Sequence, residues 1–119
     1  MSPAQRHHHR ELISRLRALA AFLDSHPQVP VPRYGTVRVS VHTKYNTDAS
    51  TEAEAINEVG RIAALLGTTP IAENGHHVAG IAFGSVRYEA VLVTQAAMER
   101  RAARDSYRDV IALDEFEGA

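Results

Sequence analysis

His76 and Glu89 are the residues whose types best suit acid–base chemistry in this chain. A histidine beside a carboxylate can act as a general base whose ring the acid orients. No serine in a recognisable nucleophile motif accompanies them, and the chain has no cysteine. We therefore predict no catalytic residues and no enzyme. A small-molecule or enzymatic site around His76 and Glu89 is kept as a third hypothesis.

The seven histidines raise the question of a metal site. Residues 7–9 are consecutive histidines, and neighbours on a helix point about 100° apart, so the three cannot bind one ion together. His42 and His76 fall on polar strand positions, whereas His77 points to the opposite face. A zinc site needs three or four ligands. We predict no metal site and no cofactor.

Arg100, Arg104 and Arg108 follow one another at intervals of four, which places them on one face if a helix continues that far. Such a face can bind phosphates. The simpler interpretation is a solvated face that pairs locally with Glu99 and Asp105. No aromatic platform accompanies the arginines, and the formal net charge of the chain is −1. Weak nucleic-acid binding through these three arginines is therefore the alternative hypothesis, not the leading one.

The element that must position the sheet residues is a hairpin over residues 76–93. Gly84-Ser85 suits a type II′ turn, because glycine accepts positive φ at its first central position. This turn pairs Phe83 with Val86 and sets the register of the whole hairpin. Alternation then predicts one core face. Its members are Ile81, Phe83, Val86, Tyr88 and Leu92.

The opposite face of the hairpin mixes valines with charged residues, which suits an interface better than either water or a core. We expect one end of it to be covered by a helix or a second subunit. The candidate partner-binding residues are Arg38, His42, His76, Arg87 and Glu89. The candidate homodimer interface is Val78, Val91 and Val93. The leading hypothesis is a homodimer that binds an unidentified protein partner through this face.

The other elements are predicted from caps and periodicity. A long helix begins at Pro3, carries a leucine stripe and ends before Pro27. A strand follows at 37–42 and a second helix at 52–66, with Gly60 expected to pack closely on the sheet. Residues 68–75 are expected to form a loop. A short helix at 95–104 and an extended segment at 107–113 complete the chain.

These elements predict an α+β fold. A long N-terminal helix precedes a β-α-β-β core with a small, partly ferredoxin-like antiparallel sheet that has helices on one face, and a C-terminal helix follows. We expect a single domain over residues 1–108 and a mobile acidic tail over 109–119. A sheet of three strands needs cover from the first helix or from a second copy.

Composition bounds the function only broadly. The chain has 119 residues, of which 45% are hydrophobic and 23% charged, and this is ordinary for a globular domain. No apolar run reaches the roughly 18 residues that span a membrane. The N-terminus lacks the apolar region of a secretory signal. We expect a cytoplasmic protein with no membrane partner.

The run LRALAAFLDSHPQVPVP, at residues 16–32, leads into a valine-rich strand. It resembles the opening of small uncharacterised proteins that are encoded by actinobacteria of the Streptomyces type and by their phages and mobile elements. The resemblance implies a cytoplasmic accessory protein from a phage or a mobile element. It brings no catalytic residues with it.

Overall fold

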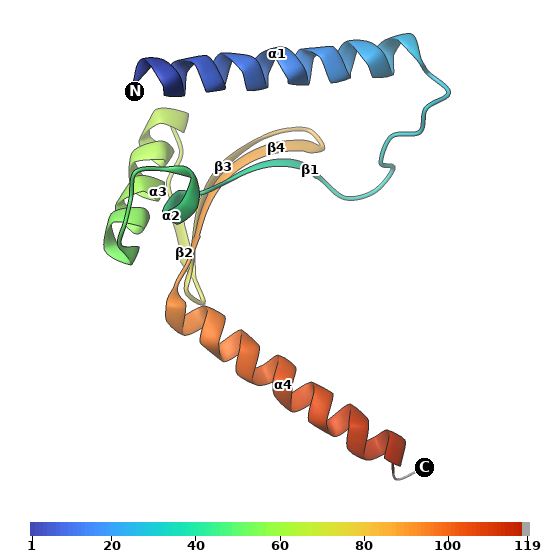
Figure 1. Cartoon of the computed structure of the whole chain (residues 1–119), viewed down its shortest axis with the longest axis vertical. Helices are drawn as coiled ribbons and strands as arrows, with labels where there is room; N and C mark the ends of the chain where they lie inside the picture. The colour runs from blue at the N-terminus through green and yellow to red at the C-terminus, as the bar shows by residue number, and fades with distance from the viewer. Residues whose placement is uncertain (118–119) are drawn as a thin grey trace. The chain divides into compact units, whose positions relative to one another are not determined.

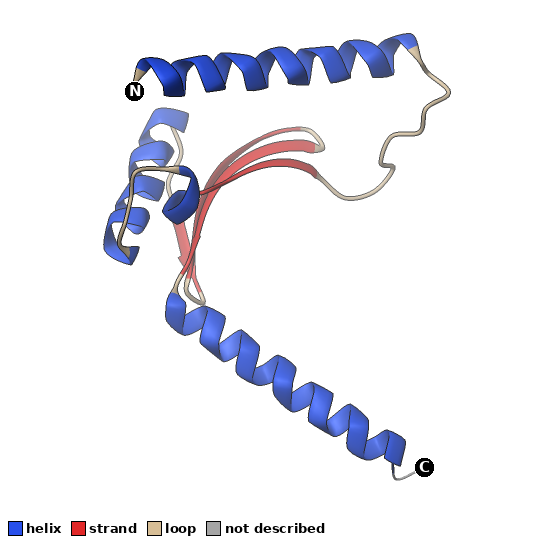
Figure 2. Ribbon diagram, viewed as in Figure 1, coloured by secondary structure: helices blue, strands red, loops and turns tan. Residues whose placement is uncertain are grey.

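The computed structural model describes the backbone of residues 1–117 and the side chains of residues 1–106. The chain divides into two compact units, Met1–Tyr34 and Gly35–Ala119. The α+β class is confirmed, with helices at both ends of the chain and a four-stranded sheet between them (Figure 2). None of the helices within the described residues is both long and apolar enough to cross a membrane.

The first unit contains one helix, α1 (Pro3–Ser25). The predicted capping box is present, because Ser2 Oγ accepts from the N–H of Gln5 and Gln5 Oε1 accepts from the N–H of Ser2. The leucine stripe is helical as predicted, but no residue of α1 is buried and Leu19 is 55% exposed. Within the first unit, nothing therefore covers the stripe of α1.

The second unit contains the sheet. Its strands are β1 (Val37–His42), β2 (Ile71–Glu73), β3 (His76–Phe83) and β4 (Val86–Val93), in the order β1-β4-β3-β2 (Figure 1). β3 and β4 are antiparallel with Phe83 opposite Val86, which confirms the predicted hairpin register. The positive φ of Gly84 (62°) fits the predicted turn.

The sheet is mixed instead of antiparallel, because β1 pairs with β4 in parallel. Helix α3 (Glu52–Leu66) connects β1 to the hairpin, and the chain then passes through β3 before β4 returns beside β1. The result is the β-α-β-β half of a ferredoxin-like sheet, in which the first strand lies beside the second strand of the hairpin.

The fourth strand, β2, lies in the segment predicted as a loop. Asn74 and Gly75 both have positive φ, 53° and 77°, as a type I′ hairpin turn requires. This turn folds β2 against β3, with Glu73 opposite His76. Alternation gave no signal here because β2 has three residues and all of them are exposed.

The core lies between α3 and one face of the sheet. Ala55, Val59 and Ala63 of α3 pack on Ala79 of β3 and Leu92 of β4. A short helix, α2 (Thr43–Asn46), joins β1 to this layer. Thr43 is fully buried, and its hydroxyl donates to the carbonyl of Ala55 at 2.8 Å. Small side chains let α3 approach the sheet closely.

The core face predicted from the hairpin is only partly buried. Ala79, Ala90 and Leu92 are buried beneath α3, whereas Phe83 is 70% exposed and Val86 is also exposed. Both residues lie at the turn end of the hairpin, and α3 covers the other end. The prediction that these two residues are core is therefore wrong, although the side of the sheet is right.

The last helix, α4, runs continuously over Gln95–Glu117. The predicted extended segment at 107–113 is therefore wrong. The acidic side chains of the predicted tail, 109–119, lie outside the described side chains, so a mobile tail stays a prediction.

Gly60 does not have the close contact that its position in α3 suggested. A Cβ placed on Gly60 would meet no atom within 4 Å. Glycine in this helix interior is therefore an entropic cost without a steric reason.

We predict that Gly60→Ala stabilises the protein by about 0.5–1 kcal/mol, because alanine restricts the unfolded chain and favours helix. Urea unfolding followed by circular dichroism measures the change. The matched control is Gly67→Ala at the end of the same helix, where φ is 72° and alanine should cost about 1 kcal/mol. A loss of stability in Gly60→Ala would show that Gly60 has a packing role after all.

Candidate functional site

The face of the sheet opposite α3, called the open face below, carries the polar residues that the sequence singled out. The register places Arg38 beside Arg87, His42 beside Val91, and His76 beside Val93. Since neighbours in register point to one side of a sheet, these residues share a face. The predicted partner-binding and dimer residues therefore lie together on the open face, but they form two separate groups.

The first group surrounds Glu89 and is called the Glu89 cluster. The carboxylate of Glu89 accepts from Nε of Arg87 at 3.2 Å and lies 3.7 Å from Nη1 of Arg38. Ser40 Oγ donates to the same carboxylate at 3.4 Å. The Glu89 side chain is only 14% exposed. Partly buried, charge-assisted contacts of this kind hold the residues in place, so the cluster is a structural feature of the middle of the sheet.

Gly80 makes room for this cluster. A Cβ on Gly80 would lie 2.5 Å from a guanidinium nitrogen of Arg87 and 2.8 Å from the carbonyl oxygen of Tyr88. Gly80 pairs with Glu89 across β3 and β4. The absence of a side chain at this position therefore lets Arg87 lie flat across β3 and reach Glu89.

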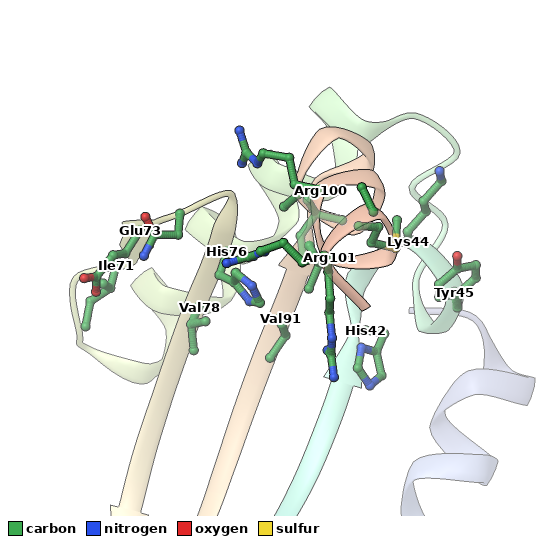
Figure 3. A pocket seen from close by; sticks show the side chains of 17 residues that line it. His42, Lys44, Tyr45, Ile71, Glu73, His76, Val78, Val91, Arg100 and Arg101 are labelled. Carbon is green, nitrogen blue, oxygen red and sulfur yellow. The ribbon is translucent and has the colours of Figure 1, made fainter. Parts of the chain in front are cut away.

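The second group lines a groove at the end of the open face where β4 passes into α4, called the basic groove below. Its volume is about 1250 Å³. The apolar part of its lining includes Ile71, Val78, Val91, Val93 and Met98. The basic part of its lining is His42, Lys44, His76, Arg100, Arg101 and Arg104. Figure 3 shows Arg101 reaching from α4 over the strand ends, on the side of the sheet that carries His42, His76 and Val91.

The first turn of α4 is fixed to two other parts of the second unit, the β2–β3 turn and α3. Thr94 accepts from the N–H of Ala97 and donates its own N–H to the carbonyl of Gly75. Glu52 of α3 accepts from the N–H of Gln95 at 2.9 Å. Ala97 is buried against the β2–β3 turn. A Cβ placed on Gly75 of this turn would lie 2.6 Å from the Cβ of Ala97. These contacts set the direction in which α4 presents its arginines.

The groove is electrostatically one-sided. Lys44, Arg100, Arg101 and Arg104 carry permanent positive charges, and Glu73 is the single carboxylate among the described lining residues. Within the part of the chain whose side chains are described, none of these four cations forms an ion pair. The local pairing expected for Arg100 and Arg104 with Glu99 and Asp105 is therefore not formed.

Glu99 is instead hydrogen-bonded to Gln95. Arg100 and Arg104 both line the groove, whereas the side chain of Arg108 lies outside the described residues.

The structure separates His76 from Glu89. His76 lies opposite Val93 and Glu89 lies opposite Gly80, four residues further along β3. At about 3.3 Å per residue the two positions are about 13 Å apart. The arrangement therefore does not form the base and orienting acid that their residue types suggested. His77 lies opposite Leu92 and points to the α3 face.

The described residues contain no group of three or more histidines or carboxylates arranged to hold a metal ion. No protein-family model, no curated protein and no solved structure matches this chain.

Sequence reasoning missed Lys44, Tyr45, Met98 and Arg101 as groove residues. Lys44 lies in α2, which begins directly after β1, and a single residue separates the end of β4 from the start of α4. The parallel pairing of these strands brings their carboxyl ends to one edge. The parallel orientation was the missing information, because a helix after β4 then lies near whatever follows β1.

We predict that Gly80→Ala destabilises the protein by about 1–3 kcal/mol, because the added methyl overlaps both Arg87 and the backbone of β4. Thermal or urea unfolding measures this loss. The double variant Gly80→Ala/Arg87→Ala should be less destabilised than the two single effects combined, because removing the guanidinium relieves part of the overlap. An unchanged stability in Gly80→Ala would contradict the close approach.

Proposed function

We propose that this protein is a non-enzymatic accessory protein of the cytoplasm that binds a protein partner through the open face of its sheet. The observation that carries the proposal is the composition of that face. Half-buried Val78, Val91 and Val93 form an apolar area in the basic groove, beside cations that form no ion pair with any described side chain. Interfaces commonly combine an apolar centre with a charged rim. The resemblance of residues 16–32 adds a phage or mobile element as the proposed setting.

The geometry gives the enzymatic alternative little support. His76 and Glu89 are far apart, and Glu89 is bound by Arg87, Arg38 and Ser40. Because the carboxylate of Glu89 already contacts two arginines, it is not available to orient a histidine. The open face is therefore better suited to binding than to acid–base chemistry.

Nucleic-acid binding through Arg100, Arg104 and Arg108 is the second candidate, and it is favoured by the groove arginines that have no ion-pair partner among residues 1–106. Phosphates would bind the cations at the rim of the groove, but they would gain no binding free energy from contact with the valines on its floor. Apart from the imidazoles of His42 and His76, Tyr45 is the one aromatic side chain in the described lining, which gives little surface for base stacking. The apolar floor thus favours a protein partner.

We predict that Val78→Lys/Val91→Lys lowers the recovery of a stoichiometric partner from host lysate at least tenfold, because two charges are placed in the apolar area. The protein is immobilised and the bound proteins are quantified by mass spectrometry. The control is Leu65→Lys, which changes a leucine of α3 that is exposed on the other side of the sheet. Equal recovery with all three proteins would contradict the open face as the binding surface.

A second copy of the chain is the alternative proposed occupant of the valine area, through Val78, Val91 and Val93, in place of the protein partner. Light scattering should then give twice the chain mass of 13.0 kDa. Val91→Lys/Val93→Lys should give the chain mass alone, because like charges would meet across a twofold interface. A dimer of unchanged mass in this variant would contradict the interface, and a monomeric parent protein would contradict the homodimer itself.

A further inference from the structure

We infer that the basic groove recognises an acidic amphipathic segment of the protein partner, in which carboxylates alternate with apolar side chains. This inference rests on the proposed function and names the chemistry of the partner. It commits the groove to one occupant, and three features of the groove support that choice.

Charge is the first feature. The rim carries four permanent positive charges and two histidines against the carboxylate of Glu73. The other arginines in the described part of the second unit are paired, Arg61 with Glu58 at 2.9 Å and Arg87 and Arg38 with Glu89 at 3.2 and 3.7 Å. Arginine guanidinium groups bind carboxylates through two parallel hydrogen bonds. A partner that supplies carboxylates therefore completes pairs that the described residues leave open.

The apolar floor is the second feature. Val78, Val91 and Val93 are half-buried beneath the cations, and Met98 lies on the helix beside them. A ligand that carries only charged groups would lose hydration free energy on this apolar floor. It would have no apolar side chains whose burial could offset that cost. A segment with apolar side chains at alternate or helical positions places them on the valines while its carboxylates reach the rim.

Size is the third feature. The groove volume of about 1250 Å³ exceeds the roughly 300–1,000 Å³ that is usual for small-molecule sites. Residues of all four strands, of α2 and of α4 line the groove. The groove therefore extends across the width of the sheet. A peptide segment fits this surface better than a compact metabolite does.

Arg101 is the residue on which we expect recognition to depend most. Among the rim cations, it extends from α4 over the strand ends on the side of the sheet that carries His42, His76 and Val91 (Figure 3). Arg104 lies one turn further along α4 and lines the same groove. The fixed first turn of α4 holds both residues at a set position relative to the sheet.

The test is fluorescence anisotropy with the full-length protein and four labelled probes of equal length. The first probe is a peptide that alternates glutamate with leucine, and the second has glutamine at each glutamate. The third is polyglutamate, and the fourth is single-stranded DNA. We expect the first probe to bind at least tenfold more tightly than each of the others. Its affinity should fall with added salt because exposed ion pairs are screened.

Variants then locate the binding. Arg101→Ala/Arg104→Ala should weaken the glutamate–leucine probe at least tenfold, and Arg101→Lys/Arg104→Lys should restore part of the affinity. The matched control is Arg61→Ala, an arginine of α3 that pairs with Glu58, and it should bind like the parent protein. Equal binding by the double alanine variant would overturn the inference. Tighter binding of DNA would transfer the groove to nucleic acid.

The two proposals can fail separately. If no acidic peptide binds while partner recovery still depends on Val78 and Val91, the acidic class is wrong and the open face stands. If neither the peptide nor the partner depends on the open face, the proposed function fails as well.

Discussion

β1 and β4 run in the same direction, and their carboxyl ends therefore meet at one edge of the sheet. This parallel pairing places the chain after His42 beside the chain after Val93. Lys44 and the arginines of α4 become neighbours only for this reason. The strand order and direction thus bring basic residues from separate parts of the chain into one groove. The hydrogen bonds of Thr94 and Glu52 then fix the first turn of α4.

The second constraint is that burial occurs on one side of the sheet. α3 covers Ala79 and Leu92 with small residues, and this packing forms the hydrophobic core. The open face takes no part in that core. Its middle is stabilised by the Glu89 cluster, in which one partly buried carboxylate contacts two arginines. Among the described side chains of the second unit, the cations without an ion pair all line the basic groove.

Local rules were sufficient for much of the fold. The hairpin register followed from a two-residue turn and the alternation of side chains, and the limits of α1 and α3 followed from Ser2, Thr51 and Gly67. All five candidate residues of the open face were assigned to one side because alternation fixes sides. Alternation does not show how far apart two residues lie along the strands. His76 and Glu89 are on the same face, but they are too far apart to form one site.

The features that could not be predicted depend on contacts between distant parts of the chain. A six-residue alternating strand reads the same whether its neighbour is parallel or antiparallel, so the sequence alone could not orient β1. β2 is too short to show a period. The exposure of Phe83 depends on where α3 ends over the sheet, and the open space at Gly60 depends on how the helix is rotated.

The contacts that fix the first turn of α4 have a consequence for the order of assembly. Glu52, Gly75 and Gln95 are far apart in sequence, and the groove also needs His42 from an earlier strand. Contacts of high sequence separation form after loop closure has been compensated by other interactions. During synthesis, the groove is therefore completed only after the ribosome has released the chain beyond Arg104, and a shorter nascent chain lacks this surface.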